Sequence, residues 1–290
     1  MQACVALEQE NCLLEGLDCE AFERGIQRTI EEHGLFSRDS KVLVACSGGK
    51  DSTVILHVLK ALGYDVEAIT VDAHIGCYTE ENLRNLRRTC DGLGVRLYEV
   101  SFRKEFGGGM CFMQQALKAK GHGYKNCHVC GVLRRQLLNK HSRTLHADVL
   151  VTGHNLDDEA QAIMMNLMRG QLFLAARTGP KSEGGGGFTP RVKPMYFCRQ
   201  KDVVAYSRLK GLPVKYTECP CNSEAYRREI RAMFKDFTEE EKENIVRQFL
   251  WLQPALKRLH AGPKAGSCST CGEPSSGSMC AACLMLREAA

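Results

Sequence analysis

A glycine-rich run between two apolar stretches is the part of the sequence whose residue types most clearly support chemistry. Residues 47–52 read Ser-Gly-Gly-Lys-Asp-Ser, after an apolar run at 41–45 and before another at 54–59. The first run predicts a buried strand and the second a helix. Glycine lets the backbone approach a phosphate closely, and the start of a helix offers free N–H groups and a positive dipole end. The run therefore predicts a phosphate-binding loop, although it differs from the GxxxxGKS/T loop of ordinary nucleotide hydrolases.

Polar residues also follow the ends of other predicted strands. Asp72 ends a second strand at 66–71, and Gly153 and His154 end a fourth at 148–152. Because ligands of parallel sheets bind at the carboxyl ends of the strands, these residues should complete a nucleotide pocket, although Asp72 could equally cap a turn. We expect the nucleotide to contact a set of loop and strand-end residues: Ala45, Cys46, Ser47, Gly48, Gly49, Lys50, Asp51, Ser52, Asp72, Gly153, His154 and Asp158.

Three cysteines lie where the same pocket could use them. Cys127 and Cys130 form a CxxC ahead of a helical pattern, and Cys219 lies in a Glu-Cys-Pro-Cys sequence just past the last predicted strand. Three thiolates can hold a 4Fe-4S cluster and leave its fourth iron open to a sulfur species. A zinc site that adds Cys221 fits the residues equally well, and a redox CxxC is a third reading.

A second cysteine group ends the chain. Cys268, Cys271, Cys280 and Cys283 form a CxxC pair separated by a short polar turn. This spacing predicts structural zinc, which would supply the folding energy of a segment with little core of its own. Contact with RNA, contact with another subunit and a plain structural cap all remain open as its role.

Acidic and basic residues near these motifs have two interpretations each. Asp157 and Asp158, after the fourth strand, could bind Mg²⁺ or act in acid–base chemistry, or one could cap the following helix. Arg134 could stabilise phosphate or RNA, or be a solvated helix charge. A basic helical face could contact RNA phosphates, although interleaved glutamates equally suggest a solvated face. This face contains Arg227, Arg228, Arg231 and Lys235.

The elements that position these residues alternate along the chain. Strands predicted at 41–45, 66–71, 95–100 and 148–152 are separated by helices, among them 80–93 and 157–169. This alternation predicts an α/β fold: a doubly wound, mainly parallel sheet with helices on both faces. We expect 192–195, a helix at 201–210 and 214–217 to close the sheet. The expected domains are a helical leader at 1–38, a catalytic domain at 39–260 and a zinc ribbon at 266–288.

Composition limits the cellular context. The 290 residues suit one large domain with small appendages, and no window approaches the roughly 20 apolar residues that span a bilayer. The N-terminus lacks the pattern of a signal peptide, which points to the cytosol. The 16 cysteines are therefore better explained by metal sites or catalysis than by disulfides. The net charge of +5 permits nucleic-acid binding without requiring it.

The loop at 47–52 resembles the pyrophosphate loop of ATP pyrophosphatases, which adenylylate a substrate and release pyrophosphate. The combined motifs resemble the tRNA 2-thiouridine synthetases of the archaeal and eukaryotic type, the cytoplasmic tRNA 2-thiolation family. The resemblance covers about residues 40–285. The matching segments are 47–52, 127–135, 152–158, 191–194, 211–213, 218–220 and the terminal ribbon.

The resemblance implies a function for each motif. ATP, with Mg²⁺, would adenylylate the 2-oxo group of a tRNA uridine, and sulfur would then replace it. The resemblance places cluster ligands at Cys127, Cys130 and Cys219 and an essential acid at Asp158. The sulfur would come from sulfide or a small thiocarboxylated carrier protein, and members commonly form homodimers. Catalytic roles then fall to Lys50, Asp51 and Asp158, and tRNA contacts to Arg134, Arg227, Arg228 and Arg231.

The chain departs from the family pattern in three places. Cys4, Cys12 and Cys19 lack the spacing of the family's N-terminal zinc site, so we expect that site to be absent or degenerate. Residues 77–79 read Cys-Tyr-Thr where the family has Gly-Tyr-Arg, and Cys221 is an addition. Two other functions compete: an ATP-dependent amidating ligase on the same loop, and a non-catalytic RNA-binding or iron–sulfur module.

Overall fold

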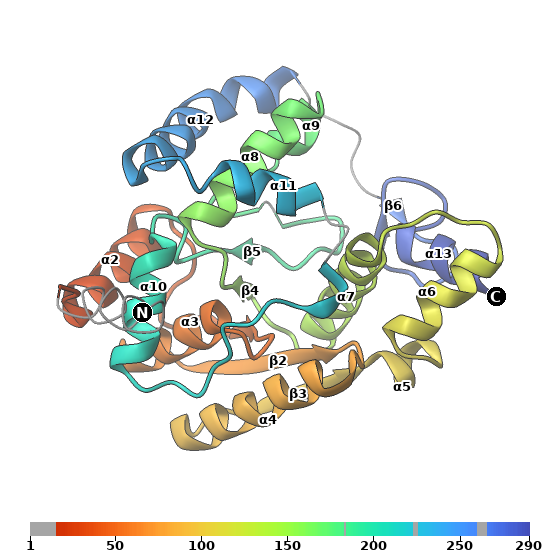
Figure 1. The fold of residues 1–290 in the computed structure, drawn as a ribbon, viewed down its shortest axis with the longest axis horizontal. Coiled ribbons are helices and arrows are strands. Elements are labelled where there is room, and N and C mark those ends of the chain that lie inside the picture. Colours follow the sequence, from red (N-terminus) through yellow and green to blue (C-terminus); the bar gives the residue numbers. More distant parts are fainter. Residues whose placement is uncertain (1–15, 183, 223–225, 260–265) are drawn as a thin grey trace, which may run out of the picture.

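Five parallel strands form the central sheet of this protein. The structure, a computed structural model, describes residues 16–182, 184–222, 226–259 and 266–290, so Cys4 and Cys12 of the expected leader site lie outside it. The strands stand in the order β3-β2-β1-β4-β5, and every pairing is parallel (Figure 1). The predicted α/β fold is confirmed. The strands are β1 (Val42–Ala45), β2 (Val66–Asp72), β3 (Leu97–Ser101), β4 (Val149–Thr152) and β5 (Arg191–Val192).

The strands form because each is a short apolar run that can be buried on both faces. Alternate residues of β1 face opposite ways: Val42 and Val44 belong to one hydrophobic core, and Leu43 belongs to another. The chain proceeds from β1 to β2 on one side and to β4 on the other, so a switch in strand order lies at the carboxyl end of β1. Open parallel sheets bind their ligands at such a point.

Helices cover both faces (Figure 1). The first core joins the sheet to α2 (Cys19–Glu32), α3 (Lys50–Ala61), α4 (Gly76–Leu93) and α10 (Gln200–Leu209). The second joins it to α5 (Phe102–Phe106), α6 (Met110–Ala119) and α7 (Asn126–Thr144). A third core packs α8 (Leu156–Met168), α9 (Leu172–Ala175), α11 (Tyr226–Met233) and α12 (Glu239–Leu259) together. None of the helices in the described ranges is long and apolar enough to cross a membrane.

The leader helix α2 packs directly on the sheet domain. Phe22, Ile26 and Ile30 are buried in the first core, at the helical spacing seen in the sequence. The Tyr206 hydroxyl of α10 donates to Glu23 at 2.5 Å and lies 3.1 Å from His57 Nδ1. The polar contacts therefore tie α2 to α10 and α3.

The expected closure of the sheet by residues 214–217 is wrong. β5 contains two residues, because Pro194 cannot donate to a strand ladder. Lys215 instead forms an isolated parallel bridge with Gly49, so the 214–219 segment crosses over the phosphate loop. The short 3₁₀ helix η1 (Pro220–Asn222) follows and contacts α7. The segment covers the carboxyl edge of the sheet instead of extending the sheet.

The C-terminal ribbon contains β6 (Gly266–Ser267), β7 (Pro274–Ser275) and α13 (Ala281–Ala289). Its two strands pair antiparallel, and α13 packs against α6 and α7. Three of its cysteines, with Ala282 and Met285, are buried in the second core together with Leu133 and Leu137 of α7. The ribbon therefore shares a hydrophobic core with the sheet domain.

Candidate functional site

The phosphate loop, residues 46–53, leaves β1 at the switch point and enters α3. Gly48 has a φ of +77°, and a Cβ there would lie 2.3 Å from the carbonyl oxygen of Asn82, so only glycine fits. Gly49 is the N-cap of α3 and provides no side-chain cap. The start of α3 therefore keeps N–H groups and the positive dipole end available for an anion.

The two serines of the loop hold its shape. Ser52 is buried; its hydroxyl accepts from Ser47 N at 3.1 Å and donates to the Gly49 carbonyl at 3.1 Å. Ser47 Oγ accepts from Gly49 N at 3.3 Å and remains at the surface. Cys46 is buried, and burial raises the pKa of its thiol well above the usual value. Ser52 and Cys46 thus shape the loop, and Ser47 faces the open side.

Asp51 joins the loop to the next strand end. Lys50 Nζ donates to both Asp51 oxygens at 2.9 and 2.8 Å, and Asn155 Nδ2 donates to Asp51 Oδ1 at 3.1 Å. A Cβ on Gly153 would lie 2.8 Å from the backbone of Asp51 and Ser52. Glycine at 153 therefore lets the end of β4 press against the phosphate loop, as the strand-end prediction required.

Asp158 has both a structural and an electrostatic role at the start of α8. Asn155 caps this helix, with its side chain accepting from Asp158 N at 3.1 Å while Asp158 Oδ2 accepts from Asn155 N. Arg227 donates to Asp158 Oδ1 at 2.9 Å. Burial would raise the pKa of Asp158, but Arg227 and His154 outweigh it and lower the pKa below the usual range. The carboxylate is ionised and faces the cleft.

Asp157, the adjacent acid, is fully committed to internal contacts. Lys242 Nζ lies 2.9 Å from Asp157 Oδ1, and Gln200 N donates to Oδ2 at 2.8 Å. It therefore joins α8 to α10 and α12. Neither aspartate is the N-cap, a role that Asn155 holds, so the expectation that one of them caps the helix is corrected to a capping-box partnership for Asp158.

A cleft of about 700 Å³ opens over the phosphate loop. Of the predicted nucleotide contacts, Ser47, Gly49, Lys50, Asp51 and Asp158 line it, as does Cys219 from the 214–219 segment. The other walls come from α10, the 214–219 segment, α11 with the residues after it, and α12. They bring the cations Lys201, Lys215, Arg231, Lys235 and Lys242, together with the acids Glu218 and Glu239. Lys215, Arg231 and Lys242 pair with carboxylates, which leaves Lys201 and Lys235 as the cations of this wall that can meet phosphate groups.

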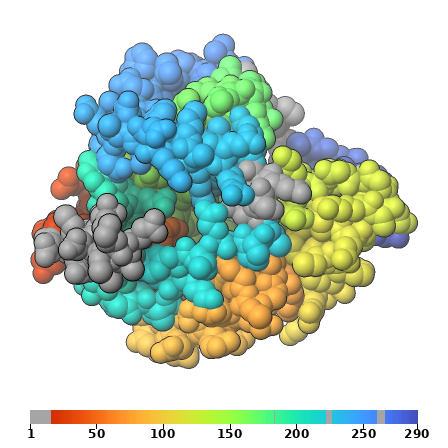
Figure 2. Space-filling view, viewed as in Figure 1, coloured from red at the N-terminus to blue at the C-terminus, as the bar shows by residue number. Residues whose placement is uncertain are grey.

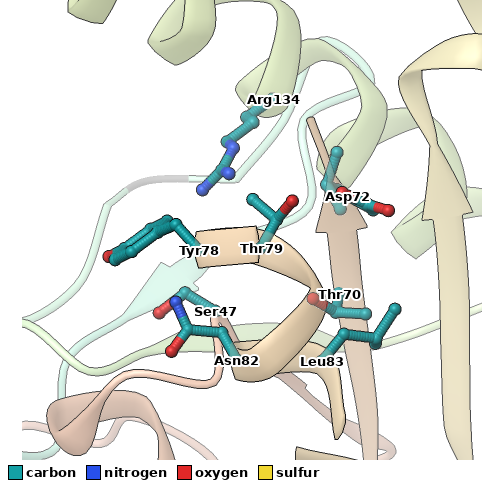
Figure 3. A pocket seen from close by; sticks show the side chains of 9 residues that line it. Ser47, Thr70, Asp72, Tyr78, Thr79, Asn82, Leu83 and Arg134 are labelled. Carbon is teal, nitrogen blue, oxygen red and sulfur yellow. The ribbon is translucent and has the colours of Figure 1, made fainter. Parts of the chain in front are cut away.

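A smaller cavity of about 40 Å³ adjoins Ser47 (Figure 3). Asp72 and Thr70 reach it from β2, Tyr78 and Asn82 from α4, and Arg134 from α7. Asn82 Oδ1 and Arg134 Nε are buried without a hydrogen-bond partner in the described part of the chain. The cavity thus offers one acceptor and one donor to a polar group beside the loop.

Asp72 also caps a turn, as the alternative reading proposed. Its Oδ1 accepts from His74 N at 2.7 Å, and its Oδ2 lies 3.2 Å from His74 Nδ1. His74 has a φ of +53°, and this contact supports that left-handed turn. His154 is exposed and lies 3.0 Å from Thr152 Oγ1. Of these two residues, Asp72 lines the small cavity.

The pocket cysteines lie close together where α7 begins and the 214–219 segment ends, and Cys219 lines the cleft. Cys127 and Cys130 both lie in the first turn of α7, and Cys127 Sγ donates to the Cys221 carbonyl at 3.6 Å. Burial raises the pKa of Cys130, partly offset by Arg134, and the neighbouring Cys219 raises it further. Burial also raises the pKa of Cys221 to about 11, with contributions from Cys219, Cys111 and Cys130. The three predicted ligands and Cys221 are therefore close neighbours.

Cys127, Cys130 and Cys219 are less tightly grouped than the ribbon cysteines. Among the described residues, the only group of three or more Cys, His, Asp and Glu side chains that converges tightly enough for one metal ion is in the ribbon. Cluster cysteines each bind a different iron, so wider spacing is expected of them. The start of α7 also provides the positive dipole end that favours thiolates. Cys127, Cys130 and Cys219 are thus neighbouring thiols of the kind that a 4Fe-4S group or a zinc ion would use as ligands.

The ribbon cysteines converge as a single-ion site. The sulfur atoms of Cys268, Cys271, Cys280 and Cys283 all lie within 4.8 Å of one another. A tetrahedral site with Zn–S bonds of about 2.3 Å requires S···S distances of about 3.8 Å. Cys271 Sγ and Cys280 Sγ are 3.7 Å apart. The Cys280 N–H bond to Cys268 Sγ, at 3.2 Å, lowers the pKa of Cys268 to about 6. The four residues fit zinc.

The basic face predicted on α11 is only partly free. Arg227 pairs with Asp158, and Arg231 lies 2.9 Å from Glu218. Arg228 and Lys235 are exposed, and Lys235 lines the cleft. Arg134 faces the small cavity from α7. The four predicted RNA-contact arginines therefore divide between two cavities and the surface.

Sequence reasoning missed several residues of the cleft. Tyr78 lines both cavities, and burial raises the pKa of its hydroxyl. Lys215 reaches the cleft only because its segment crosses the loop, where it also pairs with Glu81. Lys242 lies in an acid-rich helix start, and nothing in the local pattern distinguishes it from a solvated lysine. Of these three residues, only Tyr78 could have been found from the sequence, because it lies in the 77–79 segment that departs from the family pattern.

A protein family and several known proteins are similar to this chain in sequence. The PP-loop domain family matches residues 19–235. The cytoplasmic tRNA 2-thiolation protein 1 of Drosophila willistoni is 36% identical over 275 residues, which cover 92% of this chain and 79% of that protein. The same protein of Drosophila melanogaster matches with the same identity and coverage.

One solved structure is similar in both fold and sequence. The U34-tRNA thiolase NcsA from Methanococcus maripaludis, solved with its 4Fe-4S cluster, aligns with a TM-score of 0.72 and 26% identity. The alignment covers 92% of this chain and 87% of that chain. The family match over most of the chain and the 36% identical relatives agree with the loop geometry. The chain belongs to the PP-loop family and, within it, to the family of cytoplasmic tRNA 2-thiolation protein 1.

Proposed function

We propose that this protein is an ATP-dependent tRNA uridine 2-sulfurtransferase that works in the cytoplasm. The observation that carries the proposal is the common cleft: the phosphate loop and Cys219 line the same cavity of about 700 Å³. ATP then activates the uridine in the same cavity in which sulfur reaches the carbon that bears its 2-oxo group. The relatives' name, cytoplasmic tRNA 2-thiolation protein 1, supports both the reaction and the location.

The phosphate loop binds ATP in this proposal. The N–H groups at the start of α3 and the Lys50 ammonium hold the phosphates, and the carboxylates of Asp51 and Asp158, which both line the cleft, would bind Mg²⁺. The 2-oxo group of the uridine attacks the α-phosphate and pyrophosphate leaves. The cations of the cleft wall stabilise the charge that develops on the phosphates. The oxygen then leaves as AMP when a sulfur nucleophile attacks the same carbon.

The sulfur side of the site uses Cys127, Cys130 and Cys219. In this proposal they would hold a 4Fe-4S cluster, which would supply a binding place for the incoming sulfur. Their neighbours Arg134 and Tyr78 lie between the cysteines and the phosphate loop and orient the activated uridine. The 4Fe-4S cluster of the related thiolase supports this assignment. Zinc is assigned to the ribbon.

The partners follow from the same chemistry. The substrate is tRNA, contacted in the cleft by Lys235 and at the surface beside it by Arg228, which are both exposed. Arg231 lines the cleft, and Arg227 holds Asp158 in place. The sulfur donor is sulfide or a small thiocarboxylated carrier protein, and the protein acts as a homodimer. The names of the relatives and of the related thiolase favour this reaction over an amidating ligase or a non-catalytic module.

Nucleoside mass spectrometry tests the function. Protein purified without oxygen is incubated with ATP, Mg²⁺, sulfide and unmodified tRNA, and 2-thiouridine and AMP are measured together. We expect the wild type to give both products in equal amounts. We expect Cys219→Ser to give no 2-thiouridine. Absence of 2-thiouridine from the wild-type reaction, with cluster present, would reject the function. Fragment mapping of the product identifies the uridine.

Metal analysis tests the cofactors separately. About four irons and four sulfides per chain are expected at the pocket, and about one zinc at the ribbon. Cys127→Ser should remove the iron and keep the zinc, while Cys283→Ser should do the reverse. A colourless protein with two zinc ions per chain would contradict the cluster assignment without contradicting the ATP reaction.

A further inference from the structure

A surface away from the phosphate loop combines exposed apolar side chains with arginines. Residues 160–179 and 244–259 contain cationic residues and no Asp or Glu. The helices of these two segments pack together, because α12 contacts both α8 and α9. Figure 2 shows them side by side at the upper edge of the viewed face, α8 and α9 in green and α12 in blue. Their exposed side chains form the α9/α12 surface: Arg169, Leu172, Phe173, Arg177, Trp251 and Arg258.

The aromatic and cationic groups of this surface are interleaved. Trp251, the chain's one tryptophan, is 77% exposed, and Phe173 is 41% exposed. The Arg177 guanidinium lies 4.1 Å from the centre of the Phe173 ring. Arg169 lies 4.0 Å from the ring centre of Tyr226. Within the described ranges, no carboxylate pairs with Arg169, Arg177 or Arg258, so their positive charge is not neutralised internally.

Charge decides what covers this surface. In a two-fold contact between copies of this chain the same patch faces itself, so arginines would face arginines with no acid to pair them. A polyanion instead pairs with every arginine. Unpaired RNA bases also stack on aromatic rings and on guanidinium planes, which uses the apolar part of the surface. The combination fits RNA.

We propose that the α9/α12 surface binds the tRNA substrate outside the reacting nucleotide, an inference that rests on the proposed function. Trp251 stacks on an unpaired base, and Arg169, Arg177 and Arg258 hold backbone phosphates. The surface extends the cleft, because α8 and α12 both begin at its wall, where Asp158 and Lys242 line it. Trp251 lies nine residues beyond Lys242, about 13 Å along α12, or about four stacked nucleotides.

Two variants test the proposal by tRNA binding over a range of salt concentrations. Trp251→Ala should weaken tRNA affinity about tenfold, the effect of losing one base–aromatic stack. The triple variant Arg169→Gln, Arg177→Gln, Arg258→Gln should lower the slope of log affinity against log salt by about 2 to 3. Leu209→Ala and Arg96→Gln are the matched controls, since Leu209 is an exposed apolar residue and Arg96 covers the Tyr98 ring at the far edge of the sheet.

The outcomes separate this inference from the function itself. ATP-dependent pyrophosphate release with a short uridine-containing RNA and the circular dichroism of the variants should match the wild type. If the wild type binds and thiolates tRNA while both variants bind it equally well, the α9/α12 inference is wrong and the function stands. If Trp251→Ala alters the sedimentation of the free protein and leaves tRNA affinity unchanged, a second protein chain covers the surface, which also rejects it. If the wild type neither binds nor thiolates tRNA, the function itself fails.

Discussion

Asp51 is the side chain in which the contacts of the phosphate loop converge. It accepts from Lys50 through both oxygens and from Asn155 through one. Its own backbone lies against Gly153. A single carboxylate therefore sets the position of the lysine and contacts the end of β4. The charge of this group, more than its size, should matter for catalysis.

Asp51→Asn tests that charge. The amide keeps the size of the carboxylate but loses the charge that pairs with Lys50 and that Mg²⁺ requires. We expect a fall of about 100-fold or more in pyrophosphate release, with the free energy of unfolding changed by about 1 kcal/mol or less. Asp65→Asn, on the exposed turn before β2, is the control and should have wild-type rates. Equal rates in the two variants would contradict the role of Asp51.

Arg227 and Asp158 provide a prediction with a pH dependence. Because Arg227 lowers the pKa of Asp158, the ion pair contributes stability above the carboxyl's unfolded pKa and loses it as pH falls through the folded pKa. Arg227→Gln should cost about 1–2 kcal/mol in the free energy of unfolding at pH 7. The difference from wild type should shrink below about pH 4, where the aspartate is protonated in the unfolded chain.

Urea unfolding at pH 7, 5 and 3 measures this effect. Arg228→Gln removes a charge from the next residue, which is exposed, and is the matched control. A loss of stability that is the same at all three pH values would show that Arg227 acts through packing and not through the charge of Asp158.

At the scale of elements, the approach of β4 to the phosphate loop is a close contact between two backbones. A Cβ at Gly153 would lie 2.8 Å from backbone atoms at the start of α3, which cannot rotate away as a side chain can. The spacing between these two elements therefore depends on one missing methyl group. A displacement there should impair the reaction with ATP more than it destabilises the fold.

Gly153→Ala should cost about 1–3 kcal/mol in the free energy of unfolding, as overpacking commonly does. It should also weaken ATP binding, because the displaced loop no longer presents its N–H groups together. Gly25→Ala in α2 is the control, since nothing lies within 4 Å of that position and alanine favours a helix. Calorimetry of ATP binding and thermal unfolding measure the two effects. Wild-type ATP affinity in Gly153→Ala would overturn this account.

The elements were predictable where the pattern is local. Apolar runs identified β1, β2 and β4, and helical spacing identified α2, α4 and α8, within a few residues. The prediction failed at 214–217, since a short apolar run does not reveal whether it pairs in a ladder or crosses a loop. The partnership of Asn155 with Asp158 was also missed, although the spacing of three residues is the signature of a capping box.

The site was predictable only in part for a similar reason. Glycines, serines and paired cysteines carry their chemistry in local spacing, so the loop and both cysteine groups were found. Lys215 and Lys242 enter the cleft from residues far along the chain, and only the packing of α12 and the 214–219 segment brings them there. The residues around a single lysine do not reveal that the fold will bring it to a site formed by distant parts of the chain.

At the scale of the whole molecule, the ribbon and α7 form one body. Glu273 of the ribbon is buried and accepts from Asn139 Nδ2 at 2.7 Å and from Arg143 at 2.9 Å. Asn139 Oδ1 in turn accepts from Thr189 N at 3.1 Å. Because α7 carries Cys127 and Cys130 at its start, the ribbon supports the helix that holds the proposed cluster ligands.

Glu273→Gln should cost about 1–2 kcal/mol in the free energy of unfolding, because the amide loses the ion pair with Arg143 and leaves Asn139 with a weaker acceptor. It should also raise hydrogen exchange along α7 while zinc remains bound. Glu32→Gln, an exposed acid at the end of α2, is the control. Unchanged exchange in α7 would show that the ribbon is independent of it.

The bridge between Gly49 and Lys215 has a further consequence for how this protein can vary among its relatives. It fixes Lys215 against the phosphate loop, and four residues later Cys219 faces the cleft. One inserted residue would move Cys219 by up to about 3.3 Å. A shift of that size would take its sulfur out of bonding distance of an iron atom. Evolution is therefore free to change the identities of residues 216 and 217 but not the number of residues between Lys215 and Cys219. A family alignment should show variable letters there and no gaps.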